Sequence, residues 1–161
     1  MENIEPSALD RNLCPVMKSI STIGDKWILL ILRECFLGFK KFEDFHTNLN
    51  ISKSVLSKKL DKMISKGLLY KKQYQIEGQR SRFEYRLTGM GWDLIKVVIA
   101  LMEWGNEHLV VNGERTLKII ERDTKQNTML QLINEAGGRT DWYELKLDET
   151  IFRIRCRRII S

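Results

Sequence analysis

Residues 51–63, ISKSVLSKKLDKM, decide the fold, because in this stretch lysines and serines are interleaved with aliphatic side chains. On a helical wheel the apolar half consists of Val55, Leu56, Leu60, Met63 and Ile64. The polar half consists of Ser54, Ser57, Lys58, Asp61, Lys62 and Ser65. Ser52 is suited to cap the helix start and Gly67 to end it. We therefore expect an amphipathic helix over residues 52–66.

The polar half of this helix has the composition of a DNA-reading surface. A face that served only solubility would more often intersperse glutamate with lysine, yet Asp61 is its single acid. Serine side chains are small enough for close approach to a groove floor and can bond base edges, while lysine reaches phosphates. Lys53 and Ser54 lie at the helix start, where backbone N–H groups favour phosphate. The pattern favours DNA binding over a merely solvated face.

The elements on either side complete a known order. Helices are expected over 15–23, 26–36 and 40–48, strands over 68–75 and 82–88, and a long helix over 89–109. The run 26–36, KWILLILRECF, suits a buried strand or a buried helix, and a helix is favoured because Asp25 is a good N-cap. After Gly67 the hydrophobic period changes from 3.6 to 2, which indicates a hairpin. Three helices followed by a hairpin is the order of a winged helix-turn-helix module, here with an extra helix at each end.

Basic residues are concentrated in the same region. Residues 51–90 hold ten Lys and Arg against three Asp and Glu, a net of +7, while the whole chain has +6. A concentrated positive field attracts a polyanion, although a solvated surface explains the charge equally well by itself. Arg80 and Arg82 flank Ser81 near the hairpin tip, where an arginine can enter a minor groove or bind phosphate. The alternative for both is solvation of a strand end, and the neighbouring basic helix favours DNA.

Other classes of site find little support. His46 and His108 lie at no metal-ligand spacing, and no nucleophile elbow, glycine-rich phosphate loop or paired-carboxylate motif occurs, so we expect no enzyme, no metal and no cofactor. The chain carries no apolar run long enough for a membrane and no leader-like start. Its three scattered cysteines fit a reducing cytosol, and a cytoplasmic location is expected. The remaining alternative is a winged-helix protein-interaction module that does not bind DNA.

Five segments occur together in one order and at one spacing: CPVMKSISTIGDKWILLIL (14–32), GFKKFEDF (38–45), ISKSVLSKKLDKMISKGLL (51–69), RFEYRLTGMGWDL (82–94) and MEWG (102–105). In these segments the chain resembles the HxlR-type winged helix-turn-helix regulators of bacteria, within the MarR-like superfamily. The resemblance implies an α+β, mainly α fold and a homodimeric transcriptional repressor that binds double-stranded operator DNA. It covers residues 13–109.

The resemblance also implies roles for single residues. Helix 52–66 would read the major groove and residues 76–82 would form the wing. The groove-facing positions correspond to Lys53, Ser54, Ser57 and Lys58, and the wing arginine to Arg80 or Arg82. Members often carry proline before that arginine, whereas this chain has EGQ at 77–79. Some members carry a cysteine-rich ribbon after residue 113, and this chain lacks those cysteines.

A dimer is expected from the sequence as well. KVVIALMEW within helix 89–109 is apolar on nearly every side, so part of it needs a cover beyond its own domain. The favoured cover is the same helix of a second copy, and residues 16–23 would contribute to this dimer. The alternative cover is the segment 113–161. We expect a DNA-binding and dimerisation domain over 1–110 and a small β-prone extension over 111–161, which includes an alternating strand at 152–156.

Cys14 precedes the first predicted helix, and the amino end of a helix favours a thiolate. It matches the cysteine that precedes the N-terminal helix in HxlR-type proteins, some of which sense electrophiles or oxidants. Cys14 is therefore either a redox-sensing thiol or a small capping or interface residue. A small-molecule or electrophile inducer is compatible with either. Cys35 and Cys156 are expected in the core and inert.

Overall fold

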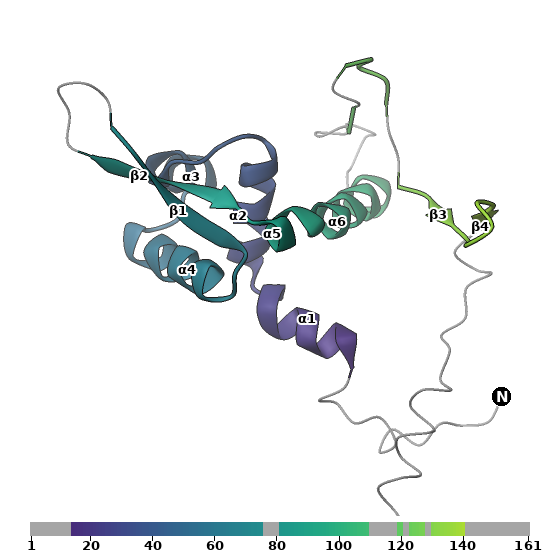
Figure 1. The fold of residues 1–161 in the computed structure, drawn as a ribbon, viewed down its shortest axis with the longest axis horizontal. Helices are drawn as coiled ribbons and strands as arrows, with labels where there is room; N and C mark the ends of the chain where they lie inside the picture. Colours follow the sequence, from purple (N-terminus) through teal and green to yellow (C-terminus); the bar gives the residue numbers. More distant parts are fainter. Residues whose placement is uncertain (1–13, 76–80, 110–118, 121–122, 128–129, 141–161) are drawn as a thin grey trace, which may run out of the picture. The chain divides into compact units, whose positions relative to one another are not determined.

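The structure is a computed structural model that describes residues 14–75, 81–109, 119–120, 123–127 and 130–140. The chain divides into two compact units, residues 22–128 and residues 1–21 with 129–161, and each is described by itself. The first unit (Figure 1) contains α2 (Lys26–Phe36), α3 (Phe42–Leu49), α4 (Lys53–Ser65), β1 (Leu69–Tyr74), β2 (Arg82–Leu87), α5 (Gly89–Asp93) and α6 (Ile95–His108).

Helix α2 forms the centre of this unit. Asp25 caps it, since the Trp27 N–H donates to Asp25 Oδ1 at 2.9 Å. Ile28, Ile31 and Leu32 are fully buried. The helix packs against α3, α4 and α6, which surround it and explain why the run 26–36 is apolar on almost every side. The predicted helix, its N-cap and its central position are confirmed.

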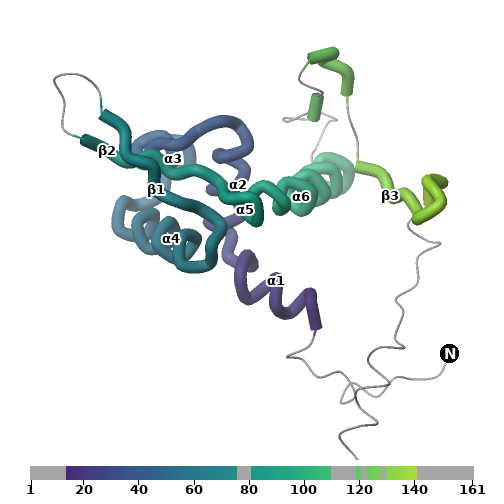
Figure 2. The backbone as a smooth tube through the Cα atoms, viewed as in Figure 1, coloured from purple at the N-terminus to yellow at the C-terminus, as the bar shows by residue number. Residues whose placement is uncertain are grey.

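Helices α3 and α4 are joined by a tight turn. Asn50 ends α3 in the left-handed region at φ 47°, and Ile51 is buried beneath the turn. The ring N–H at Nδ1 of His46 donates to the Ile51 carbonyl oxygen at 2.6 Å and holds the turn closed. The side chain of Ser52 then caps α4 by accepting from the Val55 N–H. Figure 2 follows the chain through this turn into α4 and on to the hairpin.

Helix α4 leads directly into the hairpin. Gly67 takes a positive φ of 71°, and the Leu68 N–H donates to the Met63 carbonyl at 2.9 Å, which closes a Schellman motif. Strands β1 and β2 pair antiparallel from Leu69↔Leu87 to Tyr74↔Arg82. Both predicted strands and the predicted stop at Gly67 are confirmed.

The segment before α3 extends the hairpin into a small sheet. Lys41 forms an antiparallel bridge with Glu84, and the Tyr85 N–H donates to the Lys40 carbonyl at 2.7 Å. The Tyr85 ring packs against Phe45 with ring centroids 6.3 Å apart. These contacts fix the hairpin on the helices, an arrangement that the local sequence pattern did not indicate.

The long helix predicted over 89–109 is wrong in one respect, because two helices occupy that range. The break falls at Leu94, whose ψ of −6° departs from helical geometry and whose N–H donates to the Gly91 carbonyl at 3.3 Å. Helix α5 is held on the hairpin, since Thr88 Oγ1 donates to the Gly67 carbonyl at 2.6 Å. Helix α6 packs on α2 instead. One straight helix does not satisfy both contacts, so the chain bends between them.

The second unit contains most of α1 (Pro15–Ile23). This helix begins where the Cys14 carbonyl accepts a hydrogen bond from the Lys18 N–H. Its last residue, Ile23, belongs to the core of the first unit. A short hairpin pairs β3 (Leu132–Ile133) with β4 (Arg139–Thr140) around a turn at Gly137. The strand predicted at 152–156, with Cys156, lies outside the described residues. Within the described parts, no helix combines the length and apolar character that a membrane crossing requires.

Candidate nucleic-acid interface

The two faces of α4 separate as the helical wheel predicts. Leu56, Leu60 and Met63 are fully buried against the core. Ser54, Ser57 and Lys58 are exposed on the opposite side. The helix therefore presents two small hydroxyl side chains and a long cation to solvent, in a helix-turn-helix whose inner face is the core itself.

The lysines around α4 differ in how they are paired. Lys53 Nζ lies 3.1 Å from Glu43 Oε1 of α3, and both side chains are exposed. Lys59 forms an ion pair with Asp25. Lys58 and Lys62 form no ion pair with any residue that the structure describes, so their charges are available to an incoming anion.

The amino end of α4 is suited to an anion only in part. Its first turn contains no acidic residue, and the Ser54 hydroxyl lies 3.4 Å from the capping hydroxyl of Ser52. The helix dipole and the free N–H groups of a first turn both favour phosphate there. Glu43, contributed by α3, opposes this field from outside the helix.

The hairpin places one of the two predicted wing arginines. Arg82 is exposed at the first position of β2, opposite Tyr74 in the register. Next to it, Ser81 Oγ accepts from Gln73 Nε2 at 2.5 Å. Arg80 lies in 76–80, outside the described residues, so its assignment remains a prediction.

Two further lysines, Lys71 and Lys41, lie near the hairpin and were not predicted as site residues. Lys71 of β1 lies 3.4 Å from Asp61 and 5.8 Å from the centroid of the Tyr85 ring. Lys41 lies over the Tyr74 ring at 5.6 Å. The segment LYKKQY carries two lysines and two tyrosines, but only the strand register shows that Lys71 meets the Tyr85 ring.

A family model for the HxlR-like helix-turn-helix matches residues 22–112, which include all the elements of this site. The chain belongs to the HxlR-like helix-turn-helix family. The match confirms the resemblance to this family and the winged helix-turn-helix fold class.

One relative and two solved structures are similar to this HxlR-like chain. It is 38% identical over 94 residues to Rv3095 of Mycobacterium tuberculosis, an HTH-type transcriptional regulator, and spans 58% of that relative's length. The crystal structure of PA1607, described as a candidate transcription factor, superposes with a TM-score of 0.74 at 28% identity, covering 84% of this chain and 94% of PA1607. The redox regulator HypR in its reduced form superposes with a TM-score of 0.53 at 26% identity, covering 58% of this chain and 92% of HypR.

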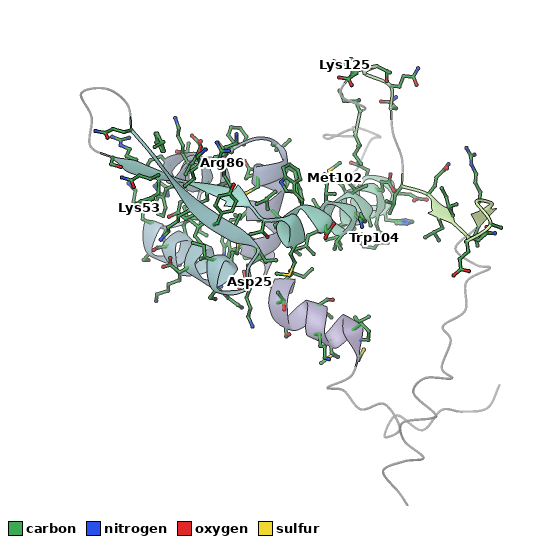
Figure 3. All side chains as sticks on the ribbon, viewed as in Figure 1. Asp25, Lys53, Arg86, Met102, Trp104 and Lys125 are labelled. Atoms are coloured by element: carbon green, nitrogen blue, oxygen red, sulfur yellow. The ribbon has the colours of Figure 1, made fainter. Side chains whose placement is uncertain are left out.

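The HxlR-like chain exposes apolar side chains on two helices. On α6, Val97, Leu101 and Trp104 are each between 39% and 55% exposed and recur at helical spacing (Figure 3 labels Trp104). On α1, Val16 and Ile20 are more than half exposed. Each surface is unusually apolar for a solvent-facing helix, and for α6 the sequence predicted this breadth of apolar surface.

The two described thiols lie in different surroundings. Cys35 is buried in α2, and burial, with a smaller contribution from Glu34, raises the pKa of its thiol to about 12. Cys14 is half-buried immediately before α1. Cys35 is thus a core residue, as predicted, while Cys14 remains accessible. Among the described residues no cluster of His, Cys, Asp and Glu is arranged to hold a metal ion.

Proposed function

We propose that this HxlR-like protein is a sequence-specific, cytoplasmic transcriptional repressor that binds operator DNA as a homodimer. In this proposal α4 reads the major groove and the wing at 76–82 contacts the flanking groove. The observation that carries it is the exposed serine and lysine face of α4, in which Lys58 has no ion-pair partner among the described residues. A protein-interaction surface would be depleted of lysine and serine at its centre instead.

The side chains divide into two roles. Ser54 and Ser57 are short and exposed, so they suit hydrogen bonds to base edges, which carry sequence information. Lys58, Lys53 and the wing residues Arg80 and Arg82 suit phosphate contacts, which fix register and supply affinity. Lys53 must leave Glu43 to make such a contact.

The homodimer is supported by the apolar faces of α6 and α1. Leu101 and Trp104 are about half exposed, and an aromatic anchor of this kind is typical of interface centres. A twofold dimer is the commonest way to cover such a stripe. We assign DNA binding and dimerisation to residues 1–110 and leave 111–161 as an extension to them.

The experiment measures binding to duplex DNA across a series of salt concentrations. Lys58→Ala should weaken binding to all sequences and lower the salt slope by about one unit, because one phosphate contact is lost. Lys96→Ala, which removes the same charge from an exposed position on α6, is the matched control and should retain the slope of the parent. If the parent binds no duplex, the protein-interaction reading replaces this proposal.

Ser54→Ala tests sequence reading separately. It removes one hydroxyl without changing charge, so the salt slope should stay constant while the preferred base at one position relaxes. Selection of bound duplexes from a random library measures this preference. An unchanged preference together with an unchanged slope for Lys58→Ala would remove α4 as the reading helix.

We also propose that Cys14 is a regulatory thiol that responds to an electrophile or oxidant. It is supported by the partly exposed position of Cys14 immediately before α1 and by the similarity to HypR, a redox regulator. Diamide should change the DNA affinity of the parent but not that of Cys14→Ser. An equal response of both proteins would make Cys14 structural.

A further inference from the structure

Lys59 occupies an unusual position on the proposed reading helix. It is the half-buried lysine of α4, lying between the core face and the exposed face, and its side chain is 24% exposed. Its partner Asp25 is equally shielded, at 25%, and immediately precedes α2 (Figure 3 labels Asp25). The pair joins residues 34 positions apart in the sequence.

The two carboxylate oxygens of Asp25 have separate partners. Oδ1 accepts from the Trp27 N–H and caps α2 at 2.9 Å. Oδ2 accepts from Lys59 Nζ. The hydrogen bond from Lys59 lowers the pKa of the Asp25 carboxyl, so the side chain stays ionised at neutral pH. One side chain therefore connects the start of the central helix to the middle of α4.

The other contacts of α4 with the core are of a different kind. Leu56, Leu60 and Met63 are aliphatic, and hydrophobic contact is not directional, so it tolerates a small roll or slide of the helix. A charged hydrogen bond fixes both distance and angle. Ser57 and Lys58 directly precede Lys59, so a roll of α4 that separates the ion pair also moves these two side chains.

We infer that Asp25 and Lys59 form a positioning pair that fixes the orientation of α4 on α2, and thereby the base-reading geometry of the helix. This inference rests on the proposed DNA-binding function and adds a requirement to it. Neither side chain contacts DNA in this role. Base contacts carry the sequence information, whereas phosphate contacts are available on every duplex, so the pair should govern sequence preference more than overall affinity.

The test uses Asp25→Asn and Lys59→Gln in the full chain. Asparagine caps helices about as well as aspartate, so Asp25→Asn removes the ion pair and keeps the N-cap of α2. The two substitutions change net charge in opposite directions. Each protein is titrated with two 30-base-pair duplexes, one selected by the parent from a random library and one of random sequence. The temperature of the titration is kept well below the lowest Tm among the proteins.

Both variants should lose about tenfold in the ratio of the two dissociation constants, which corresponds to one disturbed base contact. Binding to the random duplex should stay within about twofold, because it depends on sequence-independent electrostatic contacts to phosphates. The double variant should lose no more of this ratio than either single variant, since all three proteins lack the same hydrogen bond. Lys59→Arg, which keeps charge and donors, should restore most of the preference.

Three outcomes would overturn the inference alone. The first is tighter binding of both duplexes by Asp25→Asn with weaker binding of both by Lys59→Gln, which is an effect of net charge. The second is an unchanged ratio with only a lowered Tm, which is a purely structural role. The third is a tenfold loss for Lys59→Gln but none for Asp25→Asn, which would indicate a direct DNA contact by Lys59. A parent that binds neither duplex overturns the proposed function itself.

Discussion

Gly91 is the residue at which α5 meets the hairpin without a side chain between them. A Cβ at this position would lie 2.3 Å from the Leu68 carbonyl oxygen and 2.9 Å from Leu87 Cδ2. The first contact is with backbone, which does not move aside as a flexible side chain would. The close approach requires glycine here for lack of space and not for backbone conformation.

Gly91→Ala should therefore lower the free energy of unfolding by about 1–3 kcal/mol, as overpacking does in other cores. Gly89→Ala is the matched control, because a Cβ there meets no atom within 4 Å and alanine favours a helix. Urea unfolding followed by circular dichroism measures both. Equal stability of the two variants would show that α5 shifts freely on the hairpin.

The thiols of Cys14 and Cys35 should differ in reactivity. The thiolate is the nucleophile, and burial raises the pKa of Cys35 to about 12, so at pH 8 almost none of it is ionised in the folded protein. Iodoacetamide at pH 8 should label Cys14 and spare Cys35, with peptide mass mapping as the readout. In urea both should react, and labelling of Cys35 without denaturant would show that the core around α2 opens.

At the scale of elements, an acidic side chain of α3 neutralises a basic side chain of α4. Glu43 of α3 holds Lys53 at the start of α4, so part of the positive field there is neutralised before DNA arrives. Asp61 holds Lys71 in a similar exposed pair farther along α4. Exposed pairs of this kind contribute about 0.2–1 kcal/mol, so a phosphate can displace either acid.

Glu43→Gln should tighten binding to a random duplex about two- to fivefold and steepen the salt slope, because Lys53 no longer has a competing anion. In a Lys53→Gln background the same substitution should have little effect. Asp123→Asn, at an exposed position outside the site, changes net charge equally and is the control for a general charge effect. Weaker binding by Glu43→Gln would mean that Glu43 holds Lys53 in its binding conformation.

At the scale of the whole molecule, the proposed dimer determines how two reading helices meet DNA. Two copies of α4 would need to lie about 34–36 Å apart to enter successive major grooves on one face. The exposed Leu101 and Trp104 of α6 are the proposed centre of the interface. Both half-sites must be bound together for full affinity, so assembly and DNA binding are coupled.

Leu101→Glu should convert the dimer to a monomer, since a charge in an apolar interface is left without a partner. Light scattering at micromolar concentration measures the assembly, and DNA titration should show a parallel loss of operator affinity. Lys72→Glu, an exposed charge reversal on β1 outside the proposed interface, is the control for charge alone and should leave the dimer intact. A parent that is monomeric with and without DNA would contradict the dimer.

The elements that local chemistry defines were predictable from the sequence. Helix α4 was predictable because Ser52, the apolar spacing and Gly67 mark its start, face and end within fifteen residues or so. The same holds for α2 with Asp25 and for the alternating strands of the hairpin. The Ser54, Ser57 and Lys58 face followed directly from helical geometry.

Which distant residues meet was not predictable from local patterns and depends on how the elements pack. The bridge of Lys41 with Glu84, the ion pair of Lys59 with Asp25 and the break at Leu94 each depend on elements packing together. Helical periodicity assigns a side chain to a face but does not say which residue of another element lies opposite it. The charge of Lys59 was therefore visible in the sequence, whereas its pairing with Asp25 was a consequence of the fold.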